Sequence, residues 1–180
     1  AASAGTGGSI SPNGSVAVDC GSNQAFAIAP AACYSLTDVL VDGVSIGAAS
    51  AHTFSNVTAN HTIAASFALN GFTIAASAGT GGSISPTGNV AVGCGADQAF
   101  AIAADGCHTL ADVLVDGSSV GAVTAYTFSN VTANHTIAAS FTIIGYTVAA
   151  SAGTGGSSSP NGSIAVSCGN TAAFAVAPDG

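Results

Sequence analysis

An internal repeat limits the fold more than any other feature of this sequence. The octet AASAGTGG begins at Ala1, Ala75 and Ala149, which gives a period of 74 residues. Without a gap, residues 1–74 match residues 75–148 at 53 of 74 positions, and FSNVTANHTIAASF recurs unchanged from Phe54 and Phe128. A fixed period indicates duplication of one folding unit. We predict module 1 at residues 1–71, lacking its first strand residues, a complete module 2 at 72–145, and the N-terminal part of module 3 at 146–180, within a longer chain.

The charge composition excludes several classes of function. The chain has eight acidic residues, no Lys and no Arg, and its formal net charge is −8. Nucleic-acid binding draws most of its affinity from Lys and Arg, and so does attachment to anionic membrane surfaces. No apolar run approaches the ~20 residues of a spanning helix. The sequence therefore predicts neither nucleic-acid binding nor membrane insertion.

Alternating apolar residues predict short β-strands. In residues 72–77, FTIAAS, the apolar residues Phe72, Ile74 and Ala76 occupy every second position, and residues 61–67, 15–18 and 25–30 follow the same pattern. Such alternation is typical of strands with one buried face, and no stretch shows a sustained helical period. We expect an all-β unit of about six strands. The predicted inward positions are Val16, Val18, Phe26, Ile28, Ile63, Ala65, Phe67, Phe72, Ile74 and Ala76.

The segment DVLVDGVSIG predicts a hairpin. Asp42 and Gly43 stand between two β-branched runs, a typical two-residue turn. Leu36, Val39 and Val41 do not alternate cleanly, so we expect a bulge or a short helical turn before the hairpin. Asp38 with Asp42, and Asp112 with Asp116 in module 2, are candidate Ca²⁺ ligands. Two carboxylates fall short of the six to eight oxygens that Ca²⁺ takes, so we expect solvated turns and no metal.

The five cysteines give the sharpest chemical prediction. Cys20 and Cys33 are 13 residues apart, Cys94 and Cys107 repeat that spacing, and Cys168 would meet its counterpart one residue beyond position 180. No CxxC motif or histidine cluster accompanies them, which disfavours a metal site. We expect a disulfide within each module, Cys20 to Cys33 and Cys94 to Cys107. Such bridges indicate an oxidising, extracytoplasmic compartment, and a unit this small needs the stabilisation.

The sequence resembles the InlB B-repeat modules of large bacterial surface proteins, in divergent form. The resemblance covers nearly the whole chain and is strongest in ADVLVDGSSVGAV (111–123) and YTFSNVTANHTIAASF (126–141). It implies secreted or surface-anchored strings of small β-rich modules, with β-grasp-like and immunoglobulin-like folds as candidates, and it implies no catalytic residues. The cysteines depart from the family pattern, which carries aromatic residues at those positions.

Six asparagines satisfy the N-x-S/T pattern for glycosylation, although chance is an alternative in a chain rich in Ser and Thr. They are Asn13, Asn56, Asn60, Asn130, Asn134 and Asn161.

Nothing in the sequence places Ser, His and Asp in a catalytic arrangement. His52 aligns with Tyr126, and His108 with Tyr34, so these positions accept different chemistry in one chain. We therefore expect no enzyme and no cofactor.

Together these observations predict β modules stapled by disulfides and arranged as beads in an elongated stalk or fibre outside the cell. The expected partners are neighbouring repeats or like subunits. An adhesive module that binds a carbohydrate or protein ligand is the alternative, although the absence of Trp leaves few residues for stacking on sugars.

Overall fold

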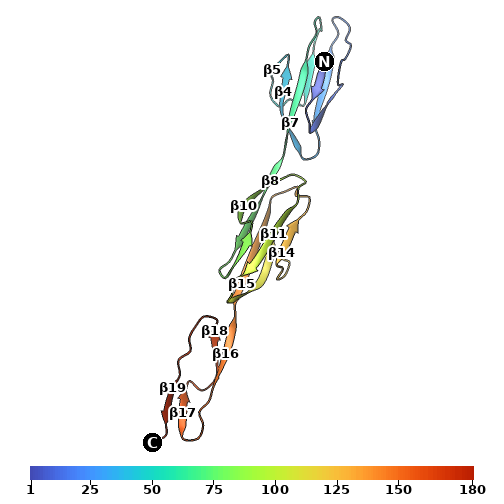
Figure 1. Ribbon diagram of the computed structural model, residues 1–180. Coiled ribbons are helices and arrows are strands. Elements are labelled where there is room, and N and C mark those ends of the chain that lie inside the picture. The colour runs from blue at the N-terminus through green and yellow to red at the C-terminus, as the bar shows by residue number, and fades with distance from the viewer. The chain divides into compact units, whose positions relative to one another are not determined.

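The computed structural model describes residues 1–180, and its regular elements are all β-strands, which confirms the predicted all-β class (Figure 1). Contacts between residues divide the chain into two compact units that interleave along the sequence. Unit 1 contains 1–72, 92–96 and 129–133, and unit 2 contains 73–91, 97–128 and 134–180. The division into three modules stays a prediction, and we use repeat 1, repeat 2 and repeat 3 for residues 1–71, 72–145 and 146–180. The structure holds no helix long and apolar enough to cross a membrane.

Repeat 1 consists of two sheets. One has the order β1-β7-β4-β5 and the other β2-β3-β6. The first and last strands, β1 and β7, pair in parallel, with Ala2 opposite Ile63, and the other pairs are antiparallel. The bounds are β1 Ala2–Ala4, β2 Gly8–Ser11, β3 Gln24–Pro30, β4 Tyr34–Val41, β5 Val44–Ser45, β6 Ala51–Phe54 and β7 Ile63–Leu69.

Repeat 2 has the same plan with one strand more. Its sheets have the orders β10-β8-β15-β12-β13 and β14-β11-β9, and β8 pairs with β15 in parallel. These eight strands exceed the predicted six, because two-residue pieces such as β13 carry no periodic signal. The bounds are β8 Gly71–Ala78, β9 Gly82–Ser85, β10 Gly88–Gly93, β11 Gln98–Ala104, β12 His108–Val115, β13 Ser118–Ser119, β14 Ala125–Phe128 and β15 His135–Ile143.

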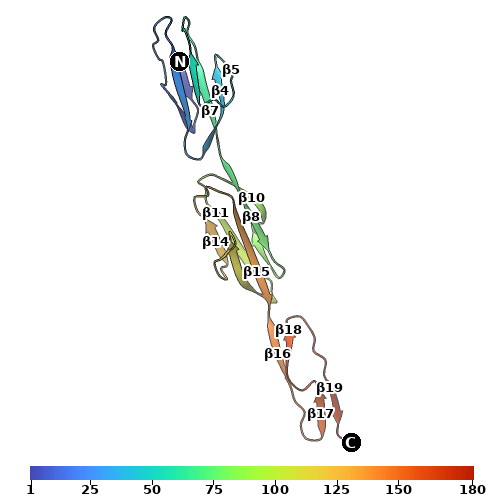
Figure 2. The same cartoon turned by 180° about the vertical axis from the view of Figure 1, so that it is seen from behind.

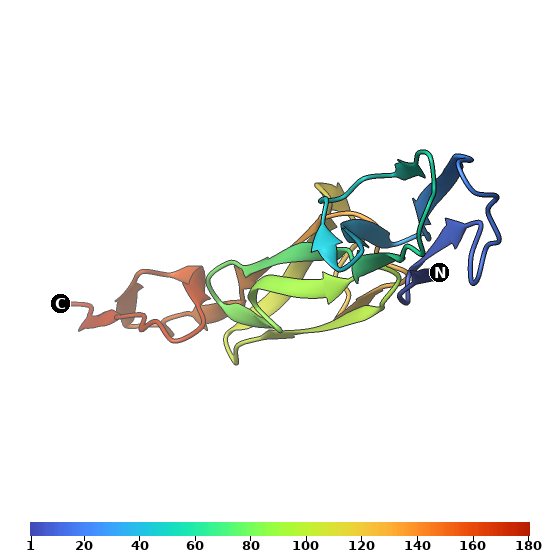
Figure 3. The same ribbon diagram turned by 90° about the horizontal axis from the view of Figure 1, so that it is seen from above.

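Repeat 3 contributes two strand pairs. β16 (Gly145–Ala150) pairs with β18 (Gly162–Ser167), as Figure 2 shows. β17 (Gly156–Ser159) pairs with β19 (Ala175–Pro178) close to the C-terminus (Figure 3). Both pairs are antiparallel, and none of their side chains is fully buried.

The core of repeat 1 lies between its two sheets. Ala2, Val39, Ile63 and Ala65 come from one sheet, and Ile10, Phe26 and Ile28 come from the other, in a single cluster of buried side chains. Two sheets that meet over alternating inward residues form a β-sandwich. This architecture is closer to the immunoglobulin-like candidate than to a β-grasp fold, which packs a helix on its sheet.

The predicted hairpin and bulge are confirmed. Asp42 and Gly43 have φ angles of 50° and 81°, which the tight turn between β4 and β5 requires. The pairing of β4 with β7 shifts register between Leu36 and Asp38, which is the irregularity expected from the broken alternation. β12 and β15 repeat the shift in repeat 2.

In repeats 1 and 2, aromatic rings pack on two glycines of the repeated octet. A side chain at Gly7 or Gly8 would overlap the rings of Tyr34 and Phe67. In repeat 2, His108 and Phe141 cover the equivalent glycines. Since a tyrosine covers the first glycine in repeat 1 and a histidine covers it in repeat 2, this position accepts rings of different chemistry.

One predicted strand forms in repeat 2 but not in repeat 1. Residues 88–93 form β10 beside β8. The matching residues Ser15–Asp19 belong to no strand. The backbone pairing at this place consists of one isolated antiparallel bridge between Ala2 and Gly14. The predicted strand at Val16 and Val18 is therefore wrong for repeat 1, where no strand pairs with these residues.

Candidate functional site

The disulfides are the clearest chemical feature of the structure, and their pairing corrects the sequence prediction. Cys33 bonds to Cys94, Cys107 bonds to Cys168, and Cys20 is free and exposed. The predicted bridges from Cys20 to Cys33 and from Cys94 to Cys107 are wrong. Each bridge spans 61 residues and joins the second cysteine of one repeat to the first cysteine of the next.

Strand geometry explains why the predicted pairing fails. The seven residues of β3 run between Cys20 and Cys33, and β11 runs between Cys94 and Cys107. A seven-residue strand is roughly 23 Å long, whereas the Cα atoms of a disulfide lie within about 7 Å of each other. The two cysteines of one repeat therefore lie at opposite ends of a strand. The observed bridges have Cα–Cα distances of 5.4 Å.

The backbone between repeats holds each pair of cysteines together. The Asn70 N–H donates to the Cys33 carbonyl oxygen at 2.8 Å, and the Cys94 N–H donates to the Asn70 carbonyl oxygen at 2.8 Å. Ile144 makes the same two hydrogen bonds with Cys107 and Cys168. One residue is thus hydrogen-bonded to both cysteines of a pair, and the disulfide joins the same two cysteines covalently. Cys33 and Cys94 belong to unit 1, and Cys107 and Cys168 belong to unit 2.

A second duplicated feature anchors the hairpin turns. Nδ1–H of His61 donates to Asp42 Oδ2 at 2.7 Å, and the Thr62 N–H donates to Asp42 Oδ1 at 2.7 Å. The Phe54 ring stacks on His61 with a centroid distance of 4.7 Å. The hydrogen bonds from Thr62 and His61 lower the pKa of Asp42. This arrangement ties the turn after β4 to the residues that lead into β7.

Repeat 2 contains the same anchor. His135 donates to Asp116 at 2.7 Å, and its ring lies 4.9 Å from that of Phe128. The hydrogen bonds from His135 and the Thr136 N–H lower the pKa of Asp116. A sequence search for metal or catalytic motifs does not find these pairs, although the shared offset of Asp and His in two repeats is a usable signal.

The candidate calcium ligands are bonded to protein donors. Asp38 Oδ1 accepts hydrogen bonds from Ser45 Oγ at 2.6 Å and from the Val39 N–H at 2.8 Å. Asp112 makes the equivalent bonds in repeat 2. Asp42 and Asp116 instead accept the hydrogen bonds from His61 and His135 that form the histidine anchors. Each of the four carboxylates therefore has a local structural role.

The six candidate glycosylation residues all have exposed side chains: Asn13, Asn56, Asn60, Asn130, Asn134 and Asn161. Asn134 differs from its counterpart Asn60, because its Oδ1 accepts a hydrogen bond from the Thr73 N–H at 2.9 Å. Exposure permits modification, and glycosylation stays a prediction.

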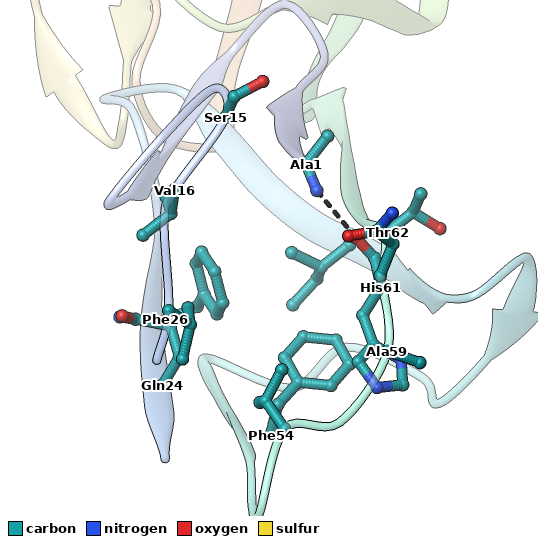
Figure 4. Close-up of a pocket in the computed structure, with 13 residues that line it drawn as sticks. Ala1, Ser15, Val16, Gln24, Phe26, Phe54, Ala59, His61 and Thr62 are labelled. Carbon is teal, nitrogen blue, oxygen red and sulfur yellow. Dashed lines mark hydrogen bonds between the residues drawn. The ribbon is translucent and has the colours of Figure 1, made fainter. Parts of the chain in front are cut away.

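Unit 1 also holds a cavity of about 450 Å³ that the sequence did not predict. Val16 and Phe26 line one side, and His61 and Thr62 line the other, with Phe54 between them (Figure 4). The wall combines apolar side chains, such as Phe26 and Phe54, with polar ones, such as Gln24, Asn60 and Thr62.

Comparison with protein-family models, with curated proteins and with solved structures finds no match. Disulfides persist in oxidising compartments, so the two bridges are compatible with an extracellular protein.

Proposed function

We propose that this chain is a structural repeat region of an extracellular microbial surface protein and forms a stalk or fibre stapled by disulfides. The observation that carries the proposal is the pairing of cysteines between successive repeats at a constant separation of 61 residues. The resemblance to InlB B-repeat modules supports the same role. In this proposal the chain has no catalytic residue, cofactor or resident metal.

Each disulfide offers tension a shorter covalent path than the 61 residues of backbone between its two cysteines. Force applied along the chain passes from Cys33 to Cys94 and from Cys107 to Cys168 through sulfur. The residues between bonded cysteines, 34–93 and 108–167, are therefore shielded from extension. Only the segment from Cys94 to Cys107, which contains β11, can lengthen between the two bridges. A stalk built this way stretches little even when its sheets unfold.

Single-molecule stretching of the chain tests this proposal. At up to about 3.5 Å per residue, the segment from Cys94 to Cys107 can extend to roughly 45 Å, and its folded strand already spans roughly 23 Å. Unfolding of one repeat should therefore release only about 20 Å with the bridges intact, and the release should rise to more than about 200 Å after reduction, when all residues of a repeat can extend. A long release under oxidising conditions would show that the bridges do not carry the tension and would contradict the structural role.

The cavity in unit 1 favours one alternative, an adhesive module that binds a carbohydrate or protein ligand. Its lining includes Phe54 and His61, flat rings of the kind that contact sugars. A broad glycan panel probed with the oxidised chain tests this alternative. Saturable binding that Phe54→Ala abolishes would support it, and binding to no glycan would count against it.

A further inference from the structure

The bonded cysteines could pair in two alternative registers. Cys94 could bond to Cys107, 13 residues downstream, or to Cys33, 61 residues upstream, and the structure holds the second bond. Cys107 has the same choice between Cys94 and Cys168. The entropic cost of closing a loop grows with the logarithm of its length, so in an unfolded chain the shorter loop should close about tenfold more often. Oxidation of an unfolded chain would therefore favour the pairing that the structure does not contain.

Strand β11 prevents the short-loop pairing once repeat 2 has folded. It lies between β9 and β14 in its sheet, and its Phe100 and Ile102 side chains are buried. The strand spans roughly 23 Å between Cys94 and Cys107, which is too far for a disulfide. One of its neighbours precedes it in the sequence and the other follows it. The two cysteines are therefore held apart only after the sheet has formed.

Main-chain hydrogen bonds bring the bonded cysteines together without any contribution from sulfur. The Asn70 N–H donates to the Cys33 carbonyl oxygen, and the Cys94 N–H donates to the Asn70 carbonyl oxygen. Ile144 makes the same bonds at the second bridge. A folded chain with free thiols therefore holds the correct partners side by side. All four bonded cysteines are only partly buried, which leaves them open to a second molecule.

We propose that the chain folds before its cysteines are oxidised, and that the folded chain with free thiols is the substrate of a thiol oxidoreductase that carries a reactive disulfide. The fold sets the pairing, and the oxidoreductase supplies the oxidising disulfide. This inference rests on the proposed structural function and deepens it, because it gives the class of reaction that must supply the stapled chain.

The reaction consists of two thiol–disulfide exchanges. One cysteine of a pair loses its proton to water, and its thiolate attacks one sulfur of the oxidoreductase disulfide. That disulfide breaks, a mixed disulfide forms, and the second sulfur of the oxidoreductase leaves as a thiolate that takes up a proton. The other cysteine of the pair then loses its proton and attacks the sulfur of the first, which releases the remaining oxidoreductase sulfur as a thiolate that is protonated in turn. The chain loses two electrons and two protons, and the oxidoreductase disulfide is reduced to two thiols.

Oxidation of the chain in its folded and unfolded states tests the order of events. Every sample carries Cys20→Ser, so that only the four bridge cysteines react. The reduced chain is either refolded and then given oxidised glutathione, or given the same reagent in concentrated guanidinium chloride. Cleavage before aspartate places the four cysteines on separate peptides, which are 19–37, 42–96, 105–111 and 116–178.

The two samples should give different linked peptides. From the folded chain we expect peptide 19–37 linked to 42–96 and peptide 105–111 linked to 116–178, which are the bridges of the structure. From the unfolded chain we expect 42–96 linked to 105–111, about tenfold in excess over 19–37 linked to 42–96. A purified dithiol oxidoreductase in its disulfide form should oxidise the folded chain to the same two bridges. Its rate should exceed that of glutathione about tenfold or more at equal disulfide concentration, because its leaving thiol has a lower pKa.

Matched variants of β11 separate control by the fold from control by loop length. Phe100→Ser removes a side chain that is 2% exposed, and in the refolded sample it should shift the product toward the bridge from Cys94 to Cys107. Ala101→Ser is the control, because Ala101 is exposed in the same strand, and it should keep the bridges of the structure.

Removal of one correct partner gives the sharpest test. In Cys33→Ser, a chain governed by loop length would join Cys94 to Cys107 and leave Cys168 free. We expect instead a free Cys94 thiol, detected by alkylation, and an intact bridge from Cys107 to Cys168, because β11 still separates Cys94 from Cys107.

Several results would overturn the inference. These are a short-loop bridge as the main product of the folded chain, the bridges of the structure as the main product of the unfolded chain, a bridge from Cys94 to Cys107 in refolded Cys33→Ser, and oxidation by the oxidoreductase no faster than by glutathione. A short release on stretching from a chain whose bridges also form without folding would overturn this inference alone. A long release from a chain that was oxidised in its folded state and holds the bridges of the structure would contradict the proposed function alone.

Discussion

Repeat 1 and repeat 2 have nearly the same sequence, yet their first sheets differ. In repeat 2, β8 and β10 complete a five-stranded sheet, and Val92 is buried. In repeat 1, Ser15–Asp19 form no strand, although SVAVD and NVAVG share the same alternation. The difference shows that a strand needs a neighbour as well as a pattern, because an unpaired edge keeps only part of its burial and few of its hydrogen bonds. The predictions below test this comparison, beginning with the largest expected effect.

Removal of the bridge from Cys33 to Cys94 should have the largest effect on stability. A loop closed across 61 residues restricts the unfolded chain by about 4 kcal/mol in the entropy model. We expect Cys33→Ser with Cys94→Ser to lower the free energy of unfolding by about that amount in urea titrations at low protein concentration.

The free cysteine provides the control for this prediction. Cys20→Ser should leave the urea midpoint unchanged, because Cys20 is not bonded in the monomer. If Cys20→Ser were as damaging as the double variant, the result would favour a disulfide within the repeat.

Equivalent phenylalanines should differ in their contribution to stability. Phe128 is 7% exposed in repeat 2, whereas Phe54 is half-buried beside the cavity. Truncation of a buried phenylalanine costs about 3–5 kcal/mol, so we expect Phe128→Ala to fall in this range. Phe54→Ala should cost at least about 1 kcal/mol less, because less apolar area leaves water when the chain folds.

The exposed neighbours Thr127→Ala and Thr53→Ala provide matched controls in the same strands. Both should lie within about 0.5 kcal/mol of the unaltered chain. Equal costs for the two phenylalanine variants, measured by urea titration, would show that the two repeats have equally complete cores.

The sequence predicted the fold class and most inward positions, because these depend on local alternation. In β3, Phe26 and Ile28 are both buried, as a period of two along the strand requires. Ile63 and Ile74 follow the same rule in their own strands. The turn that ends β4 was predictable for a different local reason, since a tight hairpin needs residues that accept positive φ.

The disulfide pairing could not be predicted from spacing alone, because it depends on where strands begin and end. The sequence did hold one usable signal, since residues 25–30 read as a strand between Cys20 and Cys33, and a strand keeps its two ends apart. The cavity and the histidine anchors depend on contacts between distant segments, such as Asp42 with His61, which no local pattern records.

Hydrogen exchange should show the difference between Ser15–Asp19 and residues 89–93 directly. Amides within the paired strand β10 should exchange about tenfold or more slowly than those of Ser15–Asp19, because strand amides are exposed only when the sheet opens. Pepsin peptides analysed by mass spectrometry at low protein concentration provide the measurement. Equal protection of the two segments in the monomer would contradict the structural difference between the repeats.

The histidine anchors should give the smallest effect, and it should be the same in both repeats. The lowered pKa values of Asp42 and Asp116 mean that their carboxylates are more acidic in the folded chain than in the unfolded chain. Their contribution to stability is therefore present above the ordinary aspartate pKa of about 4 and is lost as the pH falls through the lowered folded values. Asp42→Asn with Asp116→Asn should flatten the dependence of the melting temperature on pH below about pH 5. Asp179→Asn removes one carboxyl near the C-terminus, outside the anchors, and should leave that dependence in place. Because both aspartates are largely exposed, solvent screens these contacts, and a steep loss of stability confined to one repeat would show that the two anchors are not equivalent.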